Sequence, residues 1–465
     1  MSASSTPAPS SASSGGIERS PTRHIASFLH FPLPFDSLAR TASHRVLRLS
    51  ATKRAQKSHE SLQRMHPIHA ILGIGLLAVI ASVLGRFIPF YRRELQFIGP
   101  ARLAPLDGLR GILCFGVLYH HAVTTYYYFE TGKWEQPPSA FYSLLGGTSV
   151  AFFFCVTGFL FWSRALANNG RIQAWSFLRG RWFRIVPLYA FTCLVALAVI
   201  FRDIDWSDIS TTIGLIRMGL MGTRPWTKLG AIDVNLVNCG VTWTLQYEWA
   251  FYIALPALAL LIPSGTSRRV MFAAAAMFVM LGIGHYIYFL IGMAAADIAR
   301  RPTTSDALRR PVITMGVITL LVLFPTLASE ALNLLAMILT ALTFIPIACG
   351  NSLFGLLTWS GLRLMGTVSY SVYLLHGVFL YVGRPLLRGR MSSIDSWNLE
   401  YWLVVFALGC AVLVVCMITY RWIEWPWLQF EKQFRSRPKA PNAPGTSVSV
   451  PAITSTTRVS EPNLA

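Results

Sequence analysis

Residues 106–121 read LDGLRGILCFGVLYHH, an apolar stretch with one arginine near its start and two histidines at its end. At 100° per residue, the eleven steps from Arg110 to His121 come within about 20° of three full helical turns, so these side chains share one face. They stand roughly 16 Å apart along the axis, whereas His120 points about 80° away from that face. Ionisable groups inside a membrane helix are costly and usually face a polar cavity, so this pair predicts a functional site.

The whole chain has the composition of a membrane protein. Of its 465 residues, 54% are hydrophobic and 13% are charged, which is more apolar than a soluble globular protein requires. Runs of roughly 17–25 apolar residues, the length that a bilayer core demands of a helix, recur along the chain. The sequence therefore predicts an all-α fold, a polytopic bundle of transmembrane helices.

Basic loops set the expected topology of these runs. The runs are residues 68–89, 108–129, 142–163, 185–201, 244–263, 267–284, 285–299, 311–328, 331–349, 366–386 and 400–423. If the basic loop at 164–184 is cytoplasmic, most other basic loops fall on the same side, whereas the loop at 384–390 does not. This parity supports ten spans from residue 108 onward. The run at 68–89 is basic on both flanks, so it is either an extra N-terminal span or a helix at the membrane surface.

The charge and the cysteines exclude other classes. A net charge of +20 would indicate nucleic acid in a soluble protein, but these arginines lie mostly in tails and short loops, which favours topology signals and anionic lipid. We expect a lipid bilayer and no nucleic acid as partner. The seven cysteines are scattered without a CxxC pair, so neither a disulfide framework nor a metal site is expected.

Composition divides the chain into four parts. Residues 1–66 are Ser/Pro-rich and then basic, which predicts a disordered tail next to the membrane. Residues 67–104 hold the extra hydrophobic helix and a linker, and 105–430 form the main membrane domain. Residues 431–465 are expected to form a second disordered tail.

Five further motifs follow residues 106–121 in order. They are VAFFFCVTGFLFW (150–162), LRGRWFRIVPLY (178–189), VTWTLQYEWAFY (241–252), GTVSYSVYLLHG (366–377) and YRWIEWP (420–426). Together the six stretches resemble the acyltransferase 3 family of integral-membrane O-acyltransferases, although Thr157 stands where serine is usual. The resemblance runs from about 105 to 430. It implies transfer of a short acyl group, acetyl first among them, from acyl-CoA to a hydroxyl.

The resemblance implies roles for the polar groups inside the spans. Neutral imidazole suits a general base, so we expect His121 to be catalytic, with His120 as the alternative base. Glu248 is expected to orient His121 or to offset the imidazolium formed during transfer. The alternative for Glu248 is a rim residue bonded to a tyrosine. His376 is assigned equally to the cavity wall and to plain packing.

Three arginines are the expected binding residues for the phosphates of acyl-CoA. Arg110 shares its face with His121, and the roughly 16 Å between them is of the order of a pantetheine arm. Arg181 and Arg184 are neighbours on a helix and suit phosphate recognition. The simpler alternatives are an Arg110 that reaches the interface beside Asp107 and a loop that only signals topology. Acyl-CoA is expected as co-substrate, with no permanently bound cofactor.

A transporter or flippase is the rival interpretation, because an Arg/His/Glu path also suits proton or substrate movement. No inverted repeat favours it in this sequence. The acceptor could be a carbohydrate, a lipid or a secondary metabolite. The membrane could be an endomembrane or the plasma membrane, and the sequence leaves the oligomeric state open.

Overall fold

The computed structural model describes residues 65–96, 103–220, 228–260, 284–327, 334–391 and 399–436. Nearly all of the tail predicted at 1–66, nearly all of the span predicted at 267–284 and the tail after residue 436 lie outside these residues.

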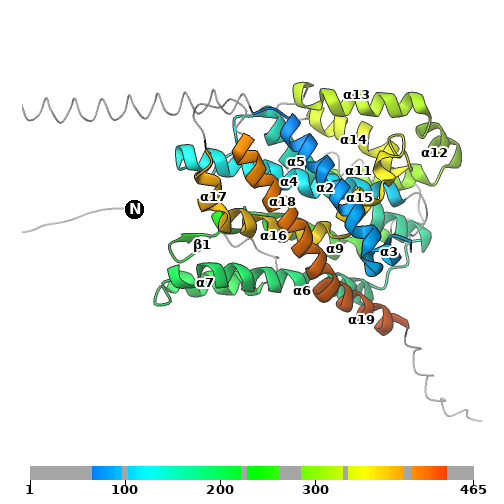
Figure 1. Cartoon of the computed structure of the whole chain (residues 1–465). Helices are drawn as coiled ribbons and strands as arrows, with labels where there is room; N and C mark the ends of the chain where they lie inside the picture. The colour runs from blue at the N-terminus through cyan, green and yellow to red at the C-terminus, as the bar shows by residue number, and fades with distance from the viewer. Residues whose placement is uncertain are drawn as a thin grey trace, which may run out of the picture. The chain divides into compact units, whose positions relative to one another are not determined.

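Helices form nearly all of the described structure, which confirms the predicted fold class (Figure 1). They are α2 (Ile68–Phe87), α3 (Pro89–Gln96), α4 (Ala104–Thr131), α5 (Ala140–Ala167), α6 (Ala174–Ile200), η2 (Phe201–Asp203), α7 (Ile209–Gly219), α8 (Asn235–Asn238), α9 (Trp243–Ala259), α11 (Tyr286–Ala299), α12 (Pro302–Leu308), α13 (Pro311–Leu327), α14 (Leu334–Ala348), η3 (Leu356–Thr358), α15 (Ser360–Thr367), α16 (Ser369–Val382), α17 (Arg384–Arg388), α18 (Leu399–Thr419), η4 (Tyr420–Glu424) and α19 (Trp425–Ser436). Within the described ranges the strands are β1 (Lys228–Leu229) and β2 (Ile232–Asp233), which pair antiparallel.

Four of these helical stretches are long and apolar enough to cross a bilayer. They are α2, α5, the stretch Ala174–Asp203 and the stretch Leu399–Phe434. Two bent pairs bring the number to six if each counts as one span: α12 with α13, bent by 60°, and α15 with α16, bent by 73°. The stretch that ends the bundle continues as helix to Ser436, so residues 431–436 are helical where the sequence predicted the start of a tail.

Helix α4, predicted as the span 108–129, is surrounded by protein. It packs against α2, α5, α14, α15, α16 and α18, and most of its residues are buried. Figure 1 shows α2 and α18 crossing over it. Because its neighbours are helices, α4 tolerates polar side chains and is less apolar than the four candidate spans. The helix that carries the predicted site is therefore central to the described bundle.

Glycines fix how α15 approaches α4. A Cβ atom on Gly108 or Gly111 would overlap the backbone carbonyls of Leu357 and Leu362, and one on Gly366 would overlap the carbonyl of Asp107. Small residues allow this backbone approach between membrane helices. The LDGLRG sequence therefore presses α4 onto α15, and the bend after α15 brings Ser369 to Arg110.

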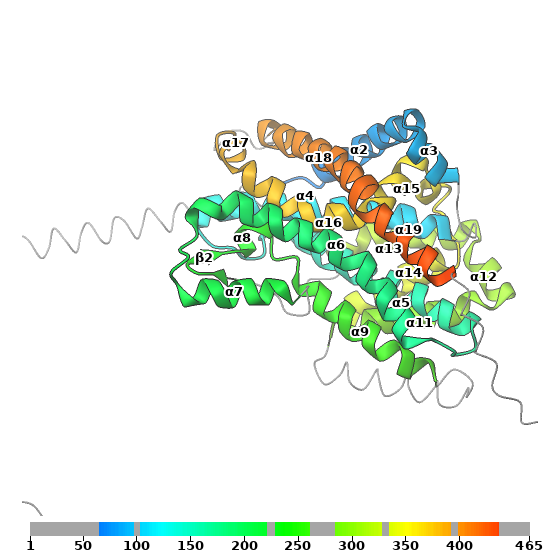
Figure 2. The same ribbon diagram turned by 90° about the horizontal axis from the view of Figure 1, so that it is seen from below.

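The outer faces of the bundle are apolar. Exposed side chains on α2, α13 and α18 include Ile71, Leu72, Val322 and Leu403. Apolar surface of this extent is unfavourable in water and suits lipid. Figure 2 shows α7 running beside α6, where the Tyr189 hydroxyl donates to the Met218 carbonyl at 3.2 Å.

Candidate active site

Three cavities lie along α4. We call the first the arginine cavity; it is lined by Asp107, Arg110, Arg181, Arg184, Arg363 and Tyr420 among others. The central cavity is lined by Arg110, Val150, Arg181, Arg184, Glu248, Tyr252, Ser369, Tyr370 and Tyr373 among others. The histidine cavity is lined by His120, His121, Thr124, Trp134, Val150, Trp243 and Tyr373 among others. Including their open mouths, they hold about 1170, 890 and 810 Å³ in that order.

Neighbouring cavities share their walls. Arg110, Arg181 and Arg184 line both the arginine cavity and the central cavity. Val150 and Tyr373 line both the central cavity and the histidine cavity. Arg110 and His121 therefore stand at opposite ends of one series of cavities, as the helical phase of α4 predicts.

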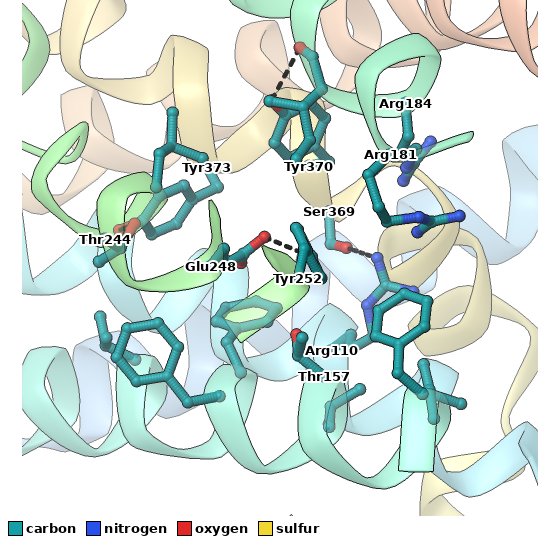
Figure 3. Close-up of a pocket in the computed structure, with 18 residues that line it drawn as sticks. Arg110, Thr157, Arg181, Arg184, Thr244, Glu248, Tyr252, Ser369, Tyr370 and Tyr373 are labelled. Carbon is teal, nitrogen blue, oxygen red and sulfur yellow. Dashed lines mark hydrogen bonds between the residues drawn. The ribbon is translucent and has the colours of Figure 1, made fainter. Parts of the chain in front are cut away.

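The central cavity places positive charge on one side. In Figure 3 the guanidinium groups of Arg110, Arg181 and Arg184 gather together, while Glu248 and Tyr373 lie across from them. All three arginines predicted to bind the donor are thus brought together. The sequence analysis missed Arg363, which it used as a topology marker and which the structure places in the arginine cavity.

Arg110 and Arg181 have little carboxylate around them. Arg110 donates from Nη2 to the Ser369 hydroxyl at 2.9 Å, and its ion pair with Asp107 is long at 3.9 Å. The Arg181 guanidinium stacks 4.6 Å from the centre of the Phe161 ring. Its buried Nε has no hydrogen-bond partner among the described residues. Both cations can therefore accept an anionic ligand without first breaking a strong ion pair.

Arg184 differs from its neighbours because it forms a buried ion pair. Its Nη1 lies 2.5 Å from Oε2 of Glu424, whose side chain is 1% exposed. The other Glu424 oxygen accepts from the Ser371 hydroxyl, and Thr419 donates to Ser371 at 3.1 Å. Arg184 was predicted to bind the donor, but its charge is already balanced, so the structure supports mainly a structural role. The sequence analysis missed Glu424, which lies in the closing motif.

At the other end of α4, His121 pairs with a second histidine. Its Nδ1 lies 3.0 Å from Nε2 of His376, and Nδ1 of His376 lies 3.0 Å from the Val372 carbonyl. A carbonyl oxygen only accepts, so Nδ1 of neutral His376 carries the proton and its Nε2 accepts. Nδ1 of His121 is then the donor. The lone pair of His121 is left on Nε2, in a ring that lines the histidine cavity.

His120 and Glu248 have other partners. His120 donates from Nδ1 to the Tyr142 carbonyl at 2.8 Å and packs so closely on Gly146 that a Cβ there would overlap its ring. Glu248 accepts from the Tyr252 hydroxyl at 2.7 Å and lines the central cavity. The group that orients His121 is therefore His376, and the expectation that Glu248 orients His121 is wrong in this structure. The tyrosine bond matches the simpler alternative for Glu248.

Fold and cavities together define a helical membrane protein with an internal polar path from clustered arginines to paired histidines. Residues 103–421 match the acyltransferase domain of the acyltransferase 3 family. That match covers about two thirds of the chain, which therefore belongs to this family of acyltransferases. The chain is also similar to acyltransferase MdmB of Streptomyces mycarofaciens, with 23% identity over 354 residues, which are 68% of this chain and 88% of the relative. No solved structure matches the chain.

Proposed function

We propose that this acyltransferase moves a short acyl group, acetyl first among them, from acyl-CoA to a hydroxyl, with His121 as general base. The observation that carries the proposal is the hydrogen-bonded chain from the Val372 carbonyl through His376 to His121. This chain fixes the tautomer that leaves Nε2 unprotonated, as the third member of a catalytic triad does for its histidine.

Nε2 of His121 takes the proton of the acceptor hydroxyl as its oxygen attacks the thioester carbonyl. When the tetrahedral intermediate collapses, the carbon–sulfur bond breaks and the imidazolium returns the proton to the departing thiolate. His376 stabilises the imidazolium by accepting from Nδ1. General base catalysis of this kind contributes on the order of 10²–10⁴-fold.

The arginine cavity is the proposed site for the nucleotide part of the donor. Guanidinium groups bind phosphate oxygens in pairs, and Arg110, Arg181 and Arg363 supply them there. The pantetheine arm then runs through the central cavity toward His121, which lies roughly 16 Å along α4 from Arg110. Glu248 balances the arginine charge in that cavity.

The acceptor enters the histidine cavity. A carbohydrate, a lipid headgroup or a secondary metabolite each offers the required hydroxyl. Trp134 provides an aromatic wall there, because its ring lies parallel to that of His121, with centres 6.4 Å apart.

The decisive experiment follows acetyl-CoA labelled in the acetyl group. Purified protein in lipid nanodiscs is incubated with labelled acetyl-CoA and a metabolite extract from its host cells, and the label in products and the free thiol are both measured. We expect label transfer and thiol release, both abolished in His121→Ala at normal expression. A transporter, the rival function, would leave the thioester intact. Unchanged transfer in His121→Ala would contradict the assigned base.

A further inference from the structure

A cysteine completes the histidine pair. Cys239 follows α8, and its sulfur and one ring nitrogen each of His121 and His376 all lie within 4.8 Å of one another. Three separate elements supply these groups. Gly377, the residue after His376, makes the approach possible, because a Cβ there would overlap the backbone of Asn238.

The geometry is close to that of a transition-metal site. Zinc binds imidazole nitrogen at about 2.0–2.1 Å and thiolate sulfur at about 2.3 Å, so tetrahedral ligands lie roughly 3.3–3.6 Å apart. The facing nitrogens of His121 and His376 are 3.0 Å apart. Closing the site requires the sulfur to move by about an ångström. Cys239 is buried and has a left-handed backbone, with φ of 56°.

The donor set selects the class of metal. Two imidazoles and one thiolate favour Zn²⁺ and related soft cations over Mg²⁺ or Ca²⁺, which prefer oxygen. We propose that His121, His376 and Cys239 form a Zn²⁺ site whose fourth position opens to the histidine cavity. Binding removes the thiol proton of Cys239, which leaves to water.

Bound zinc would switch off the proposed base, a consequence that rests on the proposed function. The metal takes the Nδ1 lone pair of His121, so the ring proton moves from Nδ1 to Nε2. Nε2 then has no lone pair with which to accept the hydroxyl proton. The site is therefore inhibitory, and removing the metal restores the active tautomer.

The first test measures binding and needs no activity. The full chain in nanodiscs is titrated with Cd²⁺, followed by the ultraviolet absorption of the cadmium–thiolate bond, and bound metal is counted after dialysis. We expect one tight equivalent in the wild type and its loss in Cys239→Ser. Cys193→Ser, which removes another buried cysteine, is the matched control and should bind as the wild type does. Equal binding by Cys239→Ser, or none by the wild type, would overturn the site.

The second test measures inhibition by Zn²⁺. Each variant is normalised to its own rate with chelator present. We expect Cys239→Ser to raise the half-inhibitory Zn²⁺ concentration by about 10-fold or more, as loss of a metal ligand requires, and chelator to restore the wild-type rate. Equal sensitivity of wild type and variant would refute the inhibitory role. Absence of acyl transfer in the metal-free wild type would contradict the proposed function alone, since the binding test decides the site.

Discussion

The two ends of α4 solve different chemical problems. The arginine end gathers permanent charges, and these are held by a hydroxyl, an aromatic ring and one buried carboxylate. The histidine end holds neutral rings in a single hydrogen-bonded chain that finishes on a backbone carbonyl. Fixed charge suits the binding of a polyanion, whereas a controlled tautomer suits proton transfer. The difference separates donor binding from catalysis along one helix.

Breaking the histidine end is expected to have the largest effect. His376→Ala removes the acceptor for Nδ1 of His121, so the tautomer is no longer fixed and kcat should fall by about 10²–10⁴-fold with little change in the KM for acyl-CoA. Steady-state kinetics with varied acyl-CoA measure both. His120→Ala is the comparison, because that ring bonds to Tyr142 instead, and its kcat should fall less. A kcat for His376→Ala equal to that of the wild type would remove His376 from the mechanism.

Breaking the ion pair at the arginine end should cost stability. Glu424→Ala leaves Arg184 buried beside no counter-charge, which typically costs about 3–5 kcal/mol. Thermal unfolding in nanodiscs measures the change. The matched control is Glu400→Ala, which removes the exposed pair with Arg390 and should cost less than about 1 kcal/mol. Equal shifts in the two variants would show that Arg184 and Glu424 do not stabilise the bundle.

The link between the two ends can be tested at a glycine. Gly111→Ala forces a methyl group into the Leu362 carbonyl, and overpacking of this kind costs about 1–3 kcal/mol. Gly75→Ala on α2 meets no atom within 4 Å and should leave stability unchanged or slightly raised, because alanine favours helix. The two unfolding temperatures should therefore move apart. A Gly111→Ala protein as stable as Gly75→Ala would refute the tight contact between α4 and α15.

The smallest effect is expected for a single donor-binding arginine. Arg181→Ala removes one guanidinium of several, so the KM for acyl-CoA should rise about 10-fold, the equivalent of one charge-assisted bond, while kcat changes little. Arg390→Ala, far out on an exposed pair, is the control and should leave the KM unchanged. A fall in kcat at unchanged KM would place Arg181 in catalysis instead.

Much of this organisation is written locally in the sequence. The shared face of Arg110 and His121 follows from helical phase, and the arginines of residues 178–189 do meet at one cavity. The partners were harder to predict, because they depend on packing between distant segments. His376 reaches His121 across 255 positions and Glu424 reaches Arg184 across 240. No period or spacing encodes such pairs.

Glu248 shows the same limit from the other direction. Its position in an apolar run correctly signals a partner, since a buried carboxylate requires one. The identity of that partner, Tyr252, lies one helical turn away on α9, whereas the imidazole expected for it belongs to a different cavity. The sequence revealed the need for a partner, and the fold chose which one.

The π-helical turn η4 has a consequence for the closing motif. A π-helix takes up one more residue per turn than an α-helix, and such turns are frequent at functional sites. Shortening residues 420–424 by one position would rotate everything that follows by about 100°. Phe183 would lose its stacking with Trp427, now 5.6 Å between ring centres. Spacing between the last membrane segment and the end of the bundle is thus a quantity that insertions and deletions cannot change freely, even where side-chain identity can vary.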